Sequence, residues 1–212
     1  MPQQAAVERD ASHDGAGRVV FEVETDIPTR HVLFRFRPYR DLVTASEHLA
    51  IVSSTPVSQG ALVRVHSECL TGEAFASEKC ECGPQLDLAL QRIADGGVVV
   101  YLRGHEGRGI GLIAKLKAYR LQQAGFDTLD ANTSLGFPAD GRDYAAAAAI
   151  LGDLGLRSVR LLTNNPDKIA QLEWHGIEVV ERVPIVTGTG PANVAYLRAK
   201  RDRMGHLIPA DT

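Results

Sequence analysis

The sequence has few cysteines, no long apolar run and no excess of charge of one sign. Its 212 residues include 3 cysteines, and its formal net charge is −3. This balance excludes a global attraction to nucleic acid or to an anionic membrane. No apolar run could cross a bilayer, and the N-terminal residues lack the apolar core of a signal peptide. An odd cysteine count argues against a secreted disulfide framework. We therefore expect a cytoplasmic globular protein that binds neither nucleic acid nor membrane.

The cysteines are Cys69, Cys80 and Cys82, all within one stretch of fourteen residues. Three thiolates can fill three of the four tetrahedral positions of zinc, which leaves the fourth for water or another protein ligand. Free cysteines can also serve as small buried apolar side chains, but Glu81 and its polar neighbours are not typical of a core. The cluster predicts a zinc site. We expect it to be open, with His66 as the alternative fourth ligand that would close it.

Hydrophobic patterns predict a mixed α/β (α+β) fold in one domain. The N-terminal half is β-rich and the C-terminal half has β/α units, around a central mixed sheet. The expected strands are 19–23, 32–36, 48–52, 61–68, 98–102, 158–162 and 177–180, with 28–30 as the connection of a first hairpin. The expected helices are 84–94, 112–124, 143–154, 166–175 and 191–204. We expect residues 1–17 to be a disordered tail, 18–206 the domain and 207–212 a C-terminal tail.

Two further segments carry candidate functional residues. The strand at 64–68 places Arg64, His66 and Glu68 on one face beside the cysteines, although a solvated sheet face is the alternative. The glycine-rich loop 104–111 joins a strand to a helix, and with Arg108, Lys115 and Lys117 it favours phosphate binding. Its glycine spacing matches neither the dinucleotide fingerprint nor the P-loop.

Two more positions lie at predicted helix starts. Asp140 and Arg142 can both project into one cleft, although a capping aspartate with an exposed arginine is the alternative. The segment 163–168 follows a predicted strand and begins a helix, where α/β proteins usually bind ligands.

Four motifs in this order resemble the GTP cyclohydrolase II family. They are Arg64-Val-His-Ser-Glu-Cys-Leu-Thr-Gly72, Lys79-Cys-Glu-Cys-Gly-Pro-Gln-Leu86, Leu102-Arg-Gly-His-Glu-Gly-Arg-Gly-Ile-Gly-Leu112 and Leu161-Leu-Thr-Asn-Asn-Pro166. The similarity runs from about residue 28 to residue 206. In many bacteria this unit is fused to a 3,4-dihydroxy-2-butanone 4-phosphate synthase, and this chain resembles the stand-alone form.

The resemblance implies an enzyme that opens GTP at C8. It releases formate and pyrophosphate and gives 2,5-diamino-6-ribosylamino-4(3H)-pyrimidinone 5′-phosphate, the first step of riboflavin biosynthesis. The implied cofactors are one Zn²⁺, held by the three thiolates with a water, and Mg²⁺ on the triphosphate. The implied partners are GTP and a second copy of the chain in a homodimer.

The resemblance also assigns roles to individual residues. Asp140 becomes a proton acceptor, Tyr119 completes the C8 chemistry, and Arg142 is either a nucleophile on the α-phosphorus or an electrostatic stabiliser. Cys69, Cys80 and Cys82 become the zinc ligands. The implied GTP contacts are Arg64, Val65, His66, Ser67, Glu68, Gln85, Glu106, Gly107, Arg108, Thr128, Thr163 and Lys168.

Three positions depart from the family pattern, and other functions stay open. Val32 lies in the first hairpin, near a place where the family has a glycine. Lys79 and Glu81 stand where arginine and aspartate are usual; both keep their charge, although lysine lacks the bidentate fork. They leave open a paralogue that stops at the formylated pyrimidine or serves a specialised pathway. A non-catalytic zinc-stapled nucleotide-binding module is a further alternative, and it would have His66 on the metal.

Overall fold

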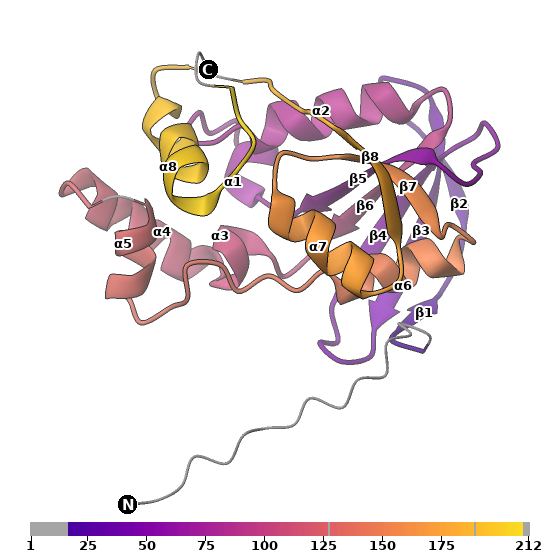
Figure 1. Ribbon diagram of the computed structural model, residues 1–212, viewed down its shortest axis with the longest axis horizontal. Coiled ribbons are helices and arrows are strands. Elements are labelled where there is room, and N and C mark those ends of the chain that lie inside the picture. The colour runs from indigo at the N-terminus through magenta and orange to yellow at the C-terminus, as the bar shows by residue number, and fades with distance from the viewer. Residues whose placement is uncertain (1–16, 127, 189, 210–212) are drawn as a thin grey trace, which may run out of the picture.

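A computed structural model describes residues 17–126, 128–188 and 190–209, and its centre is an eight-stranded sheet (Figure 1). The strands are β1 (Val19–Phe21), β2 (Thr25–Pro28), β3 (Leu33–Asp41), β4 (Glu47–Ser53), β5 (Ala61–Ser67), β6 (Gly97–Leu102), β7 (Ser158–Leu162) and β8 (Glu178–Val183). The helices are α1 (Leu70–Glu73), α2 (Cys82–Ile93), α3 (Glu106–Gly109), α4 (Leu112–Gln123), α5 (Thr128–Ser134), α6 (Ala145–Asp153), α7 (Pro166–Trp174) and α8 (Val194–Met204).

The sheet is mixed, as the sequence predicts. Its order is β1-β3-β4-β6-β5-β7-β8, with β2 paired to β3. Strands β1, β2 and β4 each pair antiparallel with β3, and β4 also pairs antiparallel with β6. Strands β6, β5, β7 and β8 are mutually parallel. The carboxyl ends of β5, β6 and β7 therefore meet at one edge, where open α/β sheets usually bind ligands.

Both faces of the parallel region are covered, which explains the continuous apolar run of β6. Val98, Val100 and Leu102 pack into a core with residues of α6 and α7, whereas Val99 packs with Ala89 and Ile93 of α2. Alternate residues of a strand point to opposite faces, so a strand covered on both sides is apolar throughout. Helices α3, α4, α5 and α8 gather at the edge of the molecule away from β1 and β2 (Figure 1).

The first expected hairpin is wrong in its pairing. Two short strands, rather than one, pair with the long strand β3: Val19 lies opposite Asp41, while Thr25 lies opposite Phe36. Pro28 is the last residue of β2 instead of part of the connection. Strand β2 has a partner on one side only, so a proline there removes no ladder hydrogen bond that the sheet requires.

The helices α1, α3 and α5 are not among the expected elements, since helices of 4 to 7 residues are too short to show a period in the sequence. Helix α8 begins at Val194 rather than at residue 191. The expected start of α7 is confirmed. The side chain of Asn165 caps the helix by accepting from the amide of Asp167, and Pro166 follows in the first turn. Among the described residues no helix is long and apolar enough to cross a membrane. Of the expected N-terminal tail, only residue 17 lies within the described residues.

Gly97 leaves no room for a larger side chain, because a Cβ there would lie 2.5 Å from the carbonyl oxygen of Leu62 and 3.1 Å from Cβ of Ile93. We expect Gly97→Ala to lower the free energy of unfolding by about 1–3 kcal/mol through overpacking. Urea denaturation measures this change in the free energy of unfolding. The control is Gly152→Ala in α6, whose new Cβ would have its nearest neighbour 3.7 Å away. Equal destabilisation by both changes would contradict the packing argument.

Candidate functional site

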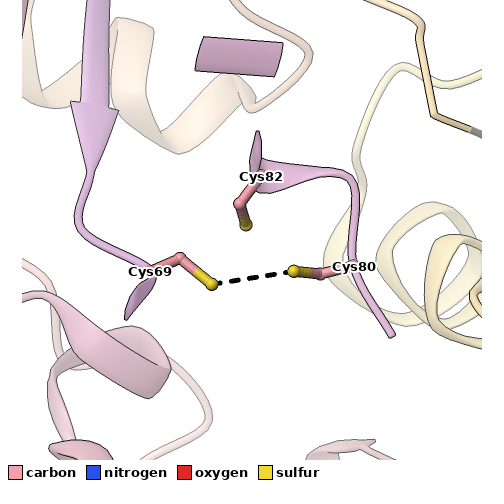
Figure 2. A group of neighbouring side chains, drawn as sticks. All are labelled: Cys69, Cys80 and Cys82. Atoms are coloured by element: carbon pink, nitrogen blue, oxygen red, sulfur yellow. Dashed lines mark hydrogen bonds between the residues drawn. The ribbon is translucent and has the colours of Figure 1, made fainter. Parts of the chain in front are cut away.

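The three cysteines converge at the carboxyl end of β5. Cys69 follows β5, while Cys80 and Cys82 lie where the chain enters α2. The sulfur atoms of Cys69 and Cys80 are 3.6 Å apart, and all three sulfurs lie within 4.8 Å of one another. Figure 2 shows the three side chains pointing toward one another. Tetrahedral bonds of about 2.3 Å to zinc would place sulfurs roughly 3.8 Å apart, so the cluster can hold a metal ion with little rearrangement.

Two glycines make room for this cluster. A Cβ on Gly72 would lie 2.8 Å from the sulfur of Cys80 and 3.3 Å from that of Cys69. A Cβ on Gly83 would lie 2.3 Å from the carbonyl oxygen of Gly72. The two backbone segments that carry the cysteines therefore approach each other more closely than any larger residue would allow.

Two carboxylates fix the first turn of α1 and with it Cys69. Glu73 accepts hydrogen bonds from the amide of Cys69 at 2.9 Å and from the hydroxyl of Tyr101 at 2.6 Å. Glu106 accepts from the amide of Leu70 at 2.7 Å. Unpaired amides at the start of a helix are thus satisfied by side chains rather than by water.

The alternative of a closed site with His66 finds no support in this geometry. Nε2 of His66 lies 2.9 Å from Oε1 of Glu73, and the described residues form one cluster of potential metal ligands, which contains the three cysteines alone. Burial lowers the pKa of His66 to about 4, so its ring is neutral at neutral pH. His66 belongs to the wall beside the metal cluster.

A cleft with about 1030 Å³ of empty space, part of it open to solvent, begins at the cysteines. Of the residues named from the sequence, the lining contains Arg64, His66, Ser67, Glu68, Cys69, Cys80, Cys82, Gln85, Gly107, Arg108, Tyr119, Arg142, Thr163 and Lys168. They come from the ends of β5 and β7 and from α2, α3, α4, α7 and the loop before α6. The folded chain thus brings most of the predicted site together.

Four predicted site residues lie outside this lining. Val65 is fully buried, and its carbonyl oxygen accepts from Nζ of Lys168 at 2.6 Å. Glu106 is buried against Lys115, and Asp140 holds Arg142. The side chain of Thr128 is outside the described residues. Val65, Glu106 and Asp140 therefore support residues that do line the cleft.

The cleft is strongly basic. Its lining includes Arg64, Arg108, Lys115, Arg142, Lys168 and Lys200, against the acids Glu68 and Glu81. Cations gathered in a low-dielectric cleft produce a positive potential that attracts an anion. Lys115, Arg142 and Lys200 pair with Glu106, Asp140 and Glu81. Arg64, Arg108 and Lys168 form no ion pair with an acid among the described residues, and this excess fits a ligand with several negative charges.

Arg108 is held in a conformation that favours such a ligand. It has a φ of 67°, in the left-handed region that few residues other than glycine adopt, and Gly107 before it has a φ of 62°. Both terminal nitrogens of the Arg108 guanidinium are buried without a hydrogen-bond partner among the described residues. A buried charged group without partners is costly, and backbone strain of this kind gathers at ligand sites. The loop therefore presents an unsatisfied cation to the cleft.

Arg142 and Asp140 form a paired unit at the cleft wall. Nε of Arg142 donates to Oδ1 of Asp140 at 2.8 Å, and a second guanidinium nitrogen contacts Oδ2. Burial lowers the pKa of Arg142, but Tyr144 and Asp140 raise it more, so the net direction is upward. Burial raises the pKa of Asp140, but its hydrogen bond with Arg142 reverses this. At neutral pH the pair is a protonated guanidinium and a carboxylate.

Lys168 is the least exposed cation of the cleft wall, at 4%. Burial, followed by the nearby charges of Arg64 and Arg142, lowers the pKa of Lys168 well below its usual value. An anion placed among these three cations would relieve their mutual repulsion and favour the charged ammonium. The site is therefore electrostatically incomplete without an anion.

Several lining residues are missing from the sequence-based set: His105 and Asn132, and from the C-terminal segment Tyr196, Lys200, His206 and Ile208. Lys200 pairs with Glu81, between two of the cysteines, and Nε2 of His206 is buried without a partner among the described residues. The amide of Leu207, expected in a C-terminal tail, donates to the carbonyl oxygen of Asn164 at 2.8 Å. His105 lies within one of the four motifs but has no predicted role there, and no motif marks the C-terminal residues, because only the return of α8 to the cleft places them there.

The chain is similar to known proteins over most of its length. Residues 20–184 match the model of the family described as GTP cyclohydrolase II. The riboflavin biosynthesis protein RibBA of Salinispora arenicola is 55% identical over 197 residues, which are 92% of this chain and 47% of that protein. RibBA of Mycobacterium avium is 55% identical over 190 residues, 86% of this chain and 45% of that protein. The chain thus spans about half the length of the curated relatives that it matches.

A solved structure described as RibBX, a two-domain 3,4-dihydroxy-2-butanone 4-phosphate synthase from A. baumannii, aligns with 82% of this chain and 42% of its own. Its TM-score is 0.48 and its identity 19%, too distant to bear on the assignment.

The close approach at Gly72 predicts that Gly72→Ala disturbs the metal cluster. Since the new methyl would lie 2.8 Å from the sulfur of Cys80, we expect zinc affinity to fall by about 10–100-fold, the usual effect of misplacing a metal ligand through its surroundings. Competition with a chromophoric chelator measures this affinity, and Gly152→Ala is again the control. Wild-type affinity in Gly72→Ala would show that the cysteines do not bind metal in this arrangement.

The buried imidazole of His105 predicts a pH dependence of stability. Burial, then the charges of Arg142 and Lys168, lower the pKa of His105 to about 3. The unfolded chain therefore takes up a proton below a pKa of ~6.5 that the folded chain does not, and stability is lost as pH falls. Between pH 7.5 and 5.5 this imidazole contributes a loss of about 1.4 kcal/mol.

We expect His105→Asn to flatten the pH dependence of the unfolding free energy by this amount. Denaturant titrations of both proteins at the two pH values measure the difference, and the thiol contributions cancel because the cysteines are the same. An identical slope in wild type and variant would mean that His105 takes up its proton over the same pH range in the folded and in the unfolded chain.

Proposed function

The chain belongs to the GTP cyclohydrolase II family, and from this premise we propose that it opens the imidazole ring of GTP. The products are formate, pyrophosphate and 2,5-diamino-6-ribosylamino-4(3H)-pyrimidinone 5′-phosphate, which is the entry to riboflavin biosynthesis. The observation that carries the proposal is a three-thiol cluster in a cleft that is also lined by Arg64, Arg108 and Lys168, cations without an acidic partner among the described residues. A metal that acts on a purine and cations that hold its triphosphate are what this reaction requires.

Cys69, Cys80 and Cys82 would hold the zinc ion. Three soft sulfur donors suit zinc, and the glycines beside them leave room for the ion rather than for a side chain. When bound, zinc is a Lewis acid that activates water at neutral pH. With His66 engaged by Glu73, the fourth position is left to water, and this favours the catalytic assignment over the zinc-stapled module.

The cations of the cleft would bind the triphosphate. Arg108 has two unpartnered guanidinium nitrogens, which suit the bidentate recognition of phosphate oxygens. Burial lowers the pKa of Lys168 and of Arg64, and a bound anion would stabilise the charged form of both side chains. Mg²⁺ would accompany the triphosphate, as in other phosphoryl transfers, to neutralise its charge.

Arg142 acts in this proposal as an electrostatic stabiliser of the α-phosphate rather than as a nucleophile. The raised pKa of Arg142, in contact with the carboxylate of Asp140, keeps its guanidinium protonated, and a protonated guanidinium has no lone pair with which to attack phosphorus. Asp140 orients that guanidinium. The pair therefore resembles an arginine that neutralises charge as pyrophosphate leaves.

The purine would lie toward the cysteines, between Gln85 and Tyr119. Gln85 has both a donor and an acceptor for a purine edge, and its carbonyl oxygen accepts from Arg64 at 2.8 Å. Burial raises the pKa of Tyr119, so its hydroxyl keeps its proton at neutral pH and can donate it at the reacting carbon. Two lysine ammonium groups lie over its ring, Lys79 at 5.2 Å and Lys115 at 5.6 Å from the centroid.

We also propose a homodimer, on the basis of an apolar face of α4 and its surroundings. Ile113 is 74% exposed and Leu116 49% exposed, and Ile113 lines one hollow together with the exposed Phe137. Apolar side chains gathered on one face commonly mark a protein interface.

The test is incubation with GTP, Mg²⁺ and Zn²⁺, with formate and pyrophosphate assayed together. We expect both products in equal amounts. Pyrophosphate without formate would instead indicate the paralogue that stops at the formylated pyrimidine, and neither product would indicate the nucleotide-binding module.

Two variants assign the two halves of the reaction. Cys80→Ser should abolish formate release, because the metal loses a ligand. Arg142→Gln should slow pyrophosphate release by about 10³-fold or more, the usual effect of removing such an arginine, while zinc content stays at the wild-type level. Formate release by Cys80→Ser at the normal rate would exclude a metal held by this cluster from the ring opening.

A further inference from the structure

The side chain of Lys115 lies among the metal cluster rather than among the phosphate-binding groups. It projects from α4 and is only 6% exposed. Its ammonium donates to the sulfur of Cys69 at 3.2 Å, to the hydroxyl of Thr71 at 2.7 Å and to Oε1 of Glu106 at 2.6 Å. An ammonium group has three hydrogens, so all of its donors are engaged and none is left for a phosphate oxygen.

This arrangement differs from the expectation that Lys115 and Lys117 both strengthen a phosphate site. Lys117, two residues further along α4, is exposed and is absent from the lining of the basic cleft. The sequence places the two lysines in one helix after one glycine-rich loop, and only the rotation of the helix separates their surroundings. Among the glycine-loop cations, Arg108 therefore remains the one with free donors directed into the cleft.

We propose that Lys115 is a positioning residue for the metal, which holds the Cys69 sulfur in place and withdraws negative charge from it. The proposal rests on the zinc site of the proposed function. A hydrogen bond from a cation draws electron density from a thiolate, which then donates less strongly to a bound metal. A metal with weaker donors is a stronger Lewis acid, as the activation of water requires.

Glu106 gives the contact a second role. Oε1 of Glu106 accepts from Lys115, while Oε2 accepts from the amide of Leu70, next to Cys69. Glu106 also begins α3, two residues before Arg108. The pair of Lys115 and Glu106 therefore ties the phosphate-binding loop to the metal ligand, and fixes the distance between the two ends of the cleft.

The test uses the full chain and two metals, and neither measurement depends on turnover. In Lys115→Met we expect zinc affinity, from chelator competition at pH 7.5, to fall by about 10–100-fold, as for other residues that support metal ligands. With Co²⁺ bound at saturation, the sulfur-to-cobalt charge-transfer band should move to lower energy, because the sulfur of Cys69 has lost its cationic partner. The matched control is Lys117→Met, in the same helix, which should leave both measurements unchanged.

Removal of Lys115 leaves the buried carboxylate of Glu106 without its cation, which threatens folding. The double variant Lys115→Met/Glu106→Gln removes that charge and should show the same band shift, with near-ultraviolet circular dichroism to confirm the native packing. An unshifted band in a folded variant would overturn the proposal. So would unchanged zinc affinity with weakened binding of a non-hydrolysable GTP analogue, since that pattern belongs to a phosphate ligand. Failure of the wild type to release formate would contradict the proposed function, but it would leave the role of Lys115 at the metal site to be decided by these two measurements.

Discussion

The geometry of the site depends on how the first turn of α1 is held. This turn has only four residues and carries Cys69 at its start, too few to be stable by their own hydrogen bonds. Glu73 and Glu106 satisfy its first amides, and Lys115 holds the sulfur of Cys69 itself. These contacts come from α1, α3 and α4, and they meet only when the chain after β5 and the chain after β6 lie at the same edge of the sheet. Parallel pairing of β5 with β6 provides that placement.

The second constraint is the concentration of positive charge in the cleft. Burial and the nearby charge of Arg142 both lower the pKa of Arg64 and of Lys168, and Arg108 lacks partners for its terminal nitrogens among the described residues. A folded chain tolerates such an arrangement when a ligand relieves it. The cysteine cluster and these cations line one cleft, so a single ligand with a polyanionic end and a reactive ring would contact both. GTP has this form.

The sequence predicts well that the three cysteines form a cluster that could hold a metal ion, because three cysteines within fourteen residues restrict the geometry strongly and few other roles suit them. It also predicts the sheet and most of its helices from periodicity. It does not predict which lysine of α4 meets the cysteines, because Lys115 and Lys117 differ only in their direction from the helix axis. Nor does it predict the contributions of Tyr196, Lys200 and His206, since their approach to the cleft depends on the return of α8 across more than a hundred residues of chain from Glu81. The pairing of β1 and β2 with one long strand is missed for the same reason: local alternation shows that strands exist but not which end of a partner they join.

The central claim is that three thiolates hold zinc with the fourth position open to water. X-ray absorption at the zinc edge of the protein as purified measures this directly. We predict three sulfur scatterers at about 2.3 Å and one oxygen scatterer near 2.0–2.2 Å, without the outer-shell scattering of an imidazole ring. Clear imidazole scattering would place a histidine on the metal, close the site and contradict the catalytic account.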